Sequence, residues 1–188
     1  MVIQQKLYTA EEFWQILDEL DAEKRYELIR GEIVEMPPSS PENTIIAMLV
    51  GRFLGNHVYD NDLGFVTGAD GGYTLSSREV RVPDVAFISK ERSPSIPREF
   101  KGAPDLAVEV ISPSKTPRSI HDKTALYLNS GARLVWNVYP EARVVEVWQA
   151  TQDGGMKVHT LGIDDSLDSG EVLPGFTLPV KQIFPEQE

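Results

Sequence analysis

The chain has 188 residues, of which 41% are hydrophobic and 25% are charged, and it contains no cysteine. This composition predicts one globular domain over residues 1–188 and excludes disulfides, thiolate metal sites and cysteine nucleophiles. The formal net charge of −11 argues against a protein held on DNA mainly by phosphate contacts, because such proteins are usually basic.

The N-terminal third of the chain is predicted to contain a helix, a hairpin and a second helix. Thr9 and Glu12 form a capping-box pattern at the start of an apolar stripe with helical spacing. Residues 25–36 are typical of two short strands joined by a tight turn. A broadly apolar helix then starts at Ser40 or Pro41, and we expect it to be well buried against a sheet.

The rest of the chain alternates short strands with one further helix. The pattern predicts strands at residues 63–68, 73–75, 80–88, 103–112, 132–139, 143–148 and 156–161, a long surface loop at 89–102, a helix at 118–130 and a short closing helix at 178–184. The 103–112 strand, the helix and the 132–139 strand resemble a crossover unit, which requires parallel strands. The element order predicts an α/β fold with a mixed central sheet flanked by helices and extra β-hairpins.

Two of the predicted strands each carry one acid among apolar residues. Glu109 lies between two valines in the 103–112 strand, and Asp84 lies among hydrophobic residues in the 80–88 strand. Charged side chains are rarely buried unless they are paired or bind a metal. These two acids are therefore the strongest functional signal in the sequence.

A lysine on the following helix is positioned to join these acids. Ile120, Lys123 and Tyr127 have the spacing i, i+3, i+7, so they share one helical stripe. If the other two face the sheet, Lys123 faces it too. Two interpretations stay open: a functional pocket that contains Asp84, Glu109 and Lys123, or a structural ion pair between Glu109 and Lys123 with Asp84 capping a turn.

Two carboxylates and an ammonium group suit the hydrolysis of phosphodiester bonds. Carboxylate oxygens are suitable ligands for Mg²⁺ or Mn²⁺. Such an ion polarises the phosphate and lowers the pKa of a bound water. The ammonium group can orient that water or stabilise the negative charge that develops on the phosphoryl group.

A series of short motifs runs through the chain in order. They are Y-E-L-I-R-G-E at residues 26–32, R-V-P-D-V at 81–85, P-D-L-A-V-E-V-I-S-P-S at 104–114, Lys123 with Tyr127, G-A-R-L-V-W at 131–136 and L-P-G-F at 173–176. Together they closely resemble the Uma family of restriction-endonuclease-like proteins, within the PD-(D/E)xK phosphodiesterase superfamily. The resemblance covers about residues 9–184.

The resemblance implies a restriction-endonuclease-like fold and a DNA endonuclease that depends on Mg²⁺ or Mn²⁺. It implies that Asp84 is the motif aspartate, that Glu109 is the acid of the (D/E)xK element, and that Glu27 is a further catalytic and metal-binding acid. The superfamily motif places a lysine two residues after its acid, but this chain has Ile111 there. Lys123 resembles a migrated lysine that reaches the same place from the next helix.

Two features favour an alternative function. Asn43 stands where Uma-like sequences often carry a histidine, and Ile111 replaces the motif lysine. With the acidic net charge, these departures favour a non-catalytic nucleic-acid- or protein-binding module on a degenerate nuclease scaffold. Hydrolysis of another phosphate ester also stays open, because the same acids suit it and the net charge of −11 is unfavourable for DNA.

The remaining expectations concern partners, location and other chemistries. DNA and a second copy of the chain are the expected partners, because double-strand cleavage usually pairs two sites. The sequence has no apolar run long enough to span a membrane and no signal peptide pattern, so we expect a cytoplasmic protein. Ser112 and Ser114 lack a partner pattern of histidine and aspartate, and the three histidines lack zinc-like spacing.

Overall fold

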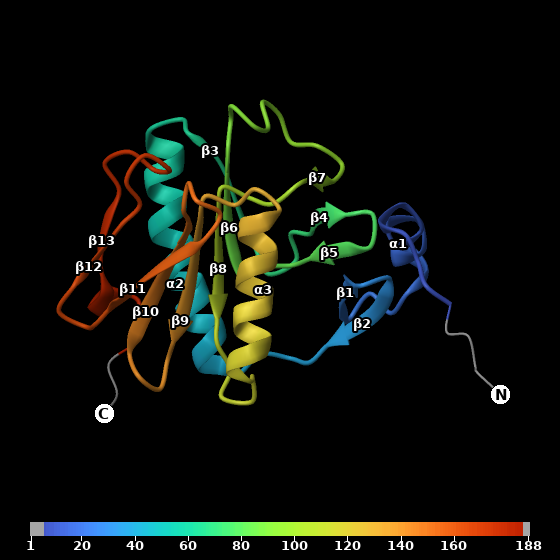
Figure 1. Cartoon of the computed structure of the whole chain (residues 1–188), viewed down its shortest axis with the longest axis horizontal. Coiled ribbons are helices and arrows are strands. Elements are labelled where there is room, and N and C mark those ends of the chain that lie inside the picture. The colour runs from blue at the N-terminus through green and yellow to red at the C-terminus, as the bar shows by residue number, and fades with distance from the viewer. Residues whose placement is uncertain (1–5, 186–188) are drawn as a thin grey trace.

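The computed structural model describes residues 6–185 and consists of β-sheets with helices packed against them (Figure 1). Within these residues the helices are α1 (Ala10–Ile16), η1 (Leu17–Glu19), α2 (Pro41–Asp60), α3 (Pro117–Asn129) and η2 (Val180–Gln182). Thr9, Ser40 and Thr116 each precede an α-helix and accept a hydrogen bond from the backbone N–H three residues on. These side-chain caps explain why the helices begin there.

The larger sheet has the strand order β11-β10-β9-β8-β6-β3. Its strands are β3 (Gly64–Gly68), β6 (Val85–Ser89), β8 (Leu106–Val110), β9 (Leu134–Tyr139), β10 (Val144–Ala150) and β11 (Met156–Leu161). β8 and β9 run parallel and are connected by α3, whereas the other neighbouring strands are antiparallel. The predicted crossover and the predicted mixed central sheet are both confirmed.

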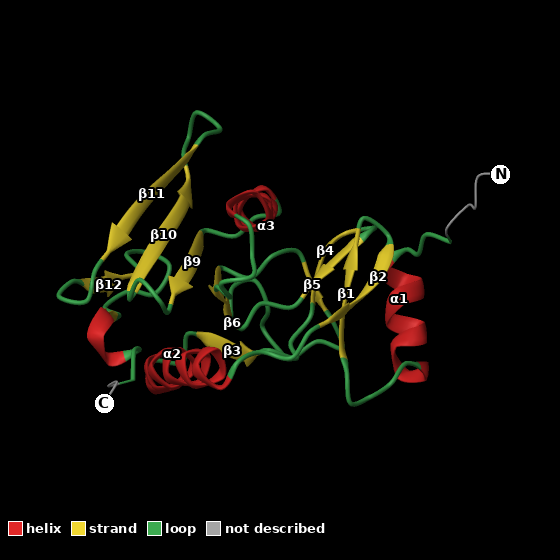
Figure 2. Cartoon of the chain, turned by 90° about the horizontal axis from the view of Figure 1, so that it is seen from below, coloured by secondary structure: helices red, strands yellow, loops and turns green. Residues whose placement is uncertain are grey.

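Helices α2 and α3 cover opposite faces of this sheet (Figures 1 and 2). Val108 and its neighbours at alternate positions of β8 belong to the core cluster that includes Val50 of α2. Ala107 belongs instead to a cluster with Tyr127 of α3. Since side chains alternate along a strand, Glu109 points toward α3, as its sequence position predicts.

The prediction that α2 is well buried against a sheet is confirmed for one stripe of the helix and is wrong for its outer face. The buried apolar residues of α2 are Ile46, Val50, Leu54 and Val58, which repeat every fourth position along one stripe. Met48 is 72% exposed, and Tyr59 is 66% exposed. The helix is apolar on more of its surface than the sheet can cover.

The smaller sheet has the strand order β2-β1-β5-β4-β7. Its strands are β1 (Arg25–Ile29), β2 (Glu32–Met36), β4 (Tyr73–Ser76), β5 (Glu79–Arg81) and β7 (Phe100–Lys101). Phe13 of α1 packs against Leu28 and Val80 on the outer face of this sheet. The other face of β1, which carries Glu27, is thereby turned toward α3 (Figure 2).

The predicted strand over residues 80–88 is wrong in one respect, because the structure divides it. β5 ends at Arg81, β6 begins at Val85, and the two strands belong to different sheets. Pro83 has no N–H to donate to a strand ladder, so regular pairing stops there. Asp84 consequently lies at the junction of the two sheets and not within a strand.

The C-terminal segment also differs from its prediction. A small sheet pairs β12 (Ser166–Asp168) with β13 (Thr177–Pro179), and the closing helix is limited to η2. Strands of two or three residues, including β7 in the predicted loop, are too short to show an alternation of apolar and polar residues in the sequence. In the part of the chain that the structure describes, no helix is long and apolar enough to cross a membrane.

Candidate active site

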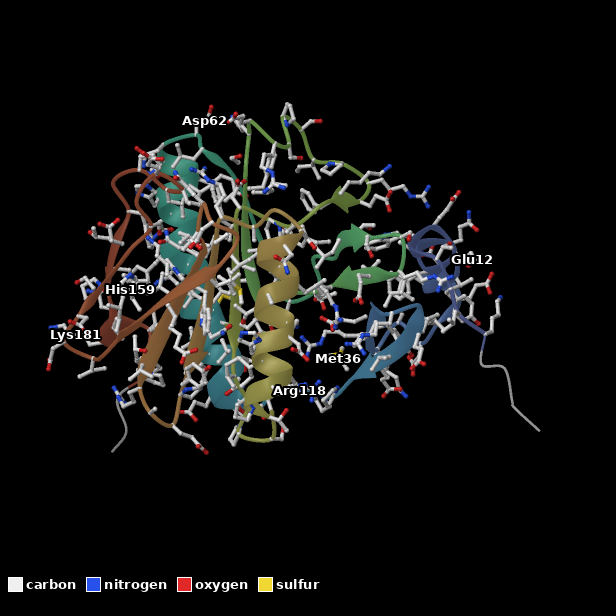
Figure 3. The ribbon with its side chains drawn as sticks, viewed as in Figure 1. Glu12, Met36, Asp62, Arg118, His159 and Lys181 are labelled. Atoms are coloured by element: carbon white, nitrogen blue, oxygen red, sulfur yellow. The ribbon has the colours of Figure 1, made fainter. Side chains whose placement is uncertain are left out.

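A cleft of about 690 Å³ lies where the two sheets and α3 meet. Glu27, Asp84, Glu109 and Lys123 all line it, so the structure brings the four predicted site residues together. They come from β1, the junction after Pro83, β8 and α3. Figure 3 labels Met36 on the β2 side of this region and Arg118 in the first turn of α3.

Glu109 and α3 form the centre of the site. Nζ of Lys123 lies 2.8 Å from Oε1 and 2.9 Å from Oε2 of Glu109. The hydroxyl of Tyr127, one turn further along α3, donates a hydrogen bond of 2.9 Å to Oε1 of Glu109. The helical stripe predicted from the spacing of Lys123 and Tyr127 therefore does face the acid on β8.

Glu27 supplies a second acid from the opposite wall of the cleft. Its side chain is 1% exposed, and Oε1 accepts hydrogen bonds from Nζ of Lys123 at 3.2 Å and from the N–H of Val82 at 3.0 Å. Its other oxygen accepts a hydrogen bond of 3.1 Å from Arg81. Lys123 therefore bridges two acids that are 82 residues apart in the chain (109 − 27).

Asp84 is held by the backbone of β8. Its Oδ2 accepts a hydrogen bond of 2.7 Å from the N–H of Val110, the residue that follows Glu109. Asn43, in the first turn of α2, donates a hydrogen bond of 3.3 Å to the carbonyl oxygen of Val110. These contacts connect the end of β8 to both Asp84 and α2.

The protonation of the three acids depends on their surroundings. Burial raises the pKa of Glu109 to about 7, with Lys123 opposing this shift and the charges of Asp84 and Glu27 adding to it. Burial also raises the pKa of Asp84. For Glu27, burial acts in the same direction, but Lys123, the N–H of Val82 and Arg81 together leave its pKa below the usual value.

Burial is the main cause of the raised pKa values of Asp84 and Glu109. Three carboxylates share the cleft with Lys123 and Arg81, and burial plus mutual repulsion disfavours the ionised form of Glu109. Among residues 6–185, no three His, Asp or Glu side chains are arranged to hold a metal ion. Asp84 and Glu109 nevertheless offer carboxylate oxygens, and one or two carboxylates are the protein ligands that Mg²⁺ usually takes.

The structure bears on the two interpretations left open by the sequence. The ion pair between Glu109 and Lys123 exists, but the backbone hydrogen bond that Asp84 accepts comes from Val110 at the end of β8 and not from a turn after Pro83. The same residues also line one open cleft. The ion pair therefore lies in the cleft itself.

Sequence reasoning missed several polar residues around the site. Arg81 binds Glu27, and Asn137 lies beside Glu109 in the β8–β9 register and donates a 2.9 Å hydrogen bond to Thr124. Asn137 is a polar residue within the apolar 132–139 strand, and this signal was available. Arg81 had no such signal, because its partner depends on how the two sheets meet.

Comparison with known proteins identifies the family to which the chain belongs. No curated protein matches the chain. A crystal structure described as a "putative nuclease belonging to DUF820" from Anabaena variabilis matches with a TM-score of 0.80 and 19% sequence identity, over 94% of this chain and 97% of that one. This similarity shows that the chain has the restriction-endonuclease-like fold. The Uma2 family model, described as "Putative restriction endonuclease", matches residues 10–181, and the chain therefore belongs to the Uma2 family.

Proposed function

We propose that the protein is a metal-dependent DNA endonuclease that hydrolyses phosphodiester bonds in the cleft. The observation that carries this proposal is the convergence of Asp84 and Glu109 with the ammonium group of Lys123 in one cleft. The family description and the name of the structural neighbour support a nuclease at the level of reaction class.

Asp84 and Glu109 are the proposed ligands of Mg²⁺ or Mn²⁺, because both line the cleft and burial disfavours their ionised forms, which a bound cation would stabilise. Such an ion would supply Lewis acidity toward the phosphate and lower the pKa of a bound water. Glu27 is a further acid of the same site. Since Arg81, Lys123 and Val82 already donate to its oxygens, its main contribution is to hold Lys123.

Lys123 has two roles in this proposal. Its contacts with Glu27 and Glu109 fix the ammonium group at the centre of the cleft. From there it can orient the attacking water or stabilise the negative charge that develops on the phosphoryl oxygens. Lys123 thus replaces the lysine that Ile111 does not provide.

Cleavage of supercoiled plasmid at low salt tests this function. The parent chain is expected to nick or linearise the plasmid with Mg²⁺ or Mn²⁺, whereas the Asp84→Ala/Glu109→Gln double variant is expected to be inactive and folded. Equal cleavage by both proteins would refute the assignment. Linear product in a single binding event would also support the homodimer that we propose for double-strand cleavage.

A second candidate is a non-catalytic module that binds nucleic acid or protein. The absence of a ready three-residue metal group among residues 6–185 favours it, as do Ile111 and Asn43. Calorimetric titration with Mn²⁺ separates the candidates. The endonuclease requires a stoichiometric site that Asp84→Ala removes, whereas the binding module predicts no measurable Mn²⁺ affinity.

A further inference from the structure

Arg30 has an unusual backbone conformation at the edge of the cleft. Three non-glycine residues of the described part of the chain have positive φ angles: Arg30 (54°), Asp62 (54°) and Arg143 (52°). This left-handed region is uncommon for residues with a side chain, and Asn, Asp and Gly occupy it most readily. An arginine there calls for an explanation.

The turn that contains Arg30 requires this conformation. Arg30 and Gly31 form the two-residue connection between β1 and β2, and both have positive φ, as in a type I′ hairpin turn. The turn is anchored by hydrogen bonds from the N–H of Gly31 to Arg78 and from the N–H of Arg30 to Oε1 of Glu79. The backbone is therefore fixed, and asparagine would suit the position better than arginine.

The other two residues with positive φ have side-chain partners inside the protein. Asp62 forms an ion pair with Lys90. The guanidinium of Arg143 donates a 3.3 Å hydrogen bond to the carbonyl oxygen of Pro185 and lies 5.4 Å from the ring centre of Phe184. Aspartate adopts this conformation readily, and the contacts of Arg143 explain why an arginine is kept at its position.

The guanidinium of Arg30 has no such partner. Within residues 6–185 no hydrogen bond or ion pair to its side chain is present, although Arg30 is exposed and lines the cleft. Two other cations of the cleft, Arg81 and Lys123, are neutralised by Glu27, Glu79 and Glu109. Arg30 is thus a free cation on the smaller-sheet side of the site.

A second free cation lies on the other side of the cleft. Lys115 belongs to the loop between β8 and α3, lines the cleft, and forms no ion pair within the described residues. In a protein of net charge −11, unpaired cations on two walls of one cleft favour an anionic ligand that extends across it. The fork of an arginine matches phosphate oxygens better than a lysine does.

We propose that Arg30 binds a backbone phosphate of the nucleic-acid strand that enters the cleft, with Lys115 contacting the strand from the opposite wall. This inference rests on the proposed function, because that function supplies the phosphodiester substrate. Backbone strain is retained at functional positions when the side chain is needed there. Arg30 therefore acts in substrate binding and not in the folding of the hairpin.

The test compares Arg30→Asn with the parent chain in two measurements. Binding of a fluorescein-labelled DNA duplex is followed by anisotropy in EDTA, so that no metal-dependent cleavage occurs. We expect Kd to rise about tenfold, which is the loss of one charged hydrogen bond, and the slope of log Kd against log salt to fall by about one. Thermal unfolding should move to a higher temperature, because asparagine relieves the strain.

Arg143→Asn is the matched control, because it makes the same replacement at the same kind of backbone position away from the cleft. It should leave Kd unchanged and raise the unfolding temperature less than Arg30→Asn does, since the loss of the contacts of Arg143 with Pro185 and Phe184 offsets the relief of strain. Equal Kd and salt slope for Arg30→Asn and the parent would overturn the inference, and so would a parent chain that binds no DNA. Plasmid cleavage that survives Asp84→Ala/Glu109→Gln would contradict the proposed catalytic site but not the anisotropy result.

Discussion

Two Pro-Asp pairs lie at opposite ends of the same pair of antiparallel strands. Asp84 follows Pro83, precedes β6 and accepts a hydrogen bond from Val110 at the end of β8. Asp105 follows Pro104, precedes β8 and accepts a 2.8 Å hydrogen bond from Ser89 at the end of β6. The backbone roles of the two aspartates are therefore nearly equivalent.

The two aspartates differ in what surrounds them. Asp105 is 1% exposed and faces Arg92, whose guanidinium also donates to the carbonyl oxygen of Gly131. Asp84 faces the cleft, where burial and, to a smaller extent, the charge of Glu27 raise its pKa. Asp105 thus anchors a loop to the sheet, whereas Asp84 belongs to a group of three acids that line the cleft. The same motif supports structure at one end of the strands and, in our proposal, chemistry at the other.

The largest effect should separate the two aspartates by activity. We expect Asp84→Asn to reduce the rate of plasmid cleavage about a thousandfold or more, because the proposed metal loses a charged ligand. Asp105→Asn should leave the rate per folded molecule within about threefold of the parent, since Asp105 does not line the cleft and contacts none of the proposed site residues. The measurement is the initial cleavage rate, normalised to the folded fraction by circular dichroism. Similar cleavage rates for Asp84→Asn and Asp105→Asn would contradict the proposed role of Asp84 as a metal ligand.

Removal of the cation at each end should separate the sites by stability. Lys123→Met leaves Glu27 and Glu109 without their shared partner, so we expect a loss of about 3 kcal/mol in the free energy of unfolding. Arg92→Met should cost about 1 kcal/mol, because its contact with Asp105 is long, at 3.4 Å, and the arginine is partly exposed. Urea denaturation measures both values. A larger loss of unfolding free energy for Arg92→Met than for Lys123→Met would show that the ion pair of Asp105 contributes more to stability than the contacts of Lys123 do.

The pH dependence of stability provides a third contrast. In the folded protein the pKa of Glu109 is about 7, above its usual value of 4.5, so the folded state binds this proton more tightly than the unfolded state. The contribution of Glu109 to the free energy of unfolding is fully present below about pH 4.5 and is lost as the pH rises through about 7. The unfolding temperature of the parent, relative to Glu109→Gln, should therefore fall over this interval. If the unfolding temperatures of the parent and of Glu109→Gln changed in parallel with pH, a raised pKa of Glu109 would be contradicted.

The contact between Glu109 and Lys123 was predictable because local periodicities determine it. A strand alternates its faces and a helix repeats every 3.6 residues, so Glu109, Lys123 and Tyr127 were assigned to facing surfaces from spacing alone. The contact of Glu27 with Lys123 was not predictable from such patterns. It depends on how the smaller sheet is placed relative to α3, and this is determined by tertiary packing, such as that of Phe13 on Leu28 on the other face of β1.

The Pro-Asp pairs show the same limit at a smaller scale. Asp84 was recognised as unusual within an apolar segment, but it was placed inside one continuous strand. Pro83 divides that segment between two sheets, which is why Asp84 reaches the cleft. Asp105 received no role, because a buried acid with a structural arginine and a buried acid in a functional cleft look alike in sequence.

The smallest expected effect concerns the hydroxyl that supports Glu109. Tyr127→Phe removes a hydrogen bond to the ionised carboxylate, so the pKa of Glu109 should rise further, and metal binding should require a higher pH. We expect the pH–rate profile of cleavage to shift upward by about half a unit to one unit, with a loss of about 1 kcal/mol in stability. Tyr139→Phe is the control, because its hydroxyl donates to Glu146 at 2.8 Å and Tyr139 does not line the cleft. An upward shift in both variants would be a general consequence of losing a tyrosine hydroxyl and would contradict the prediction. A shift of the pH–rate profile in Tyr127→Phe alone would show that cleavage in the cleft requires the ionised carboxylate of Glu109.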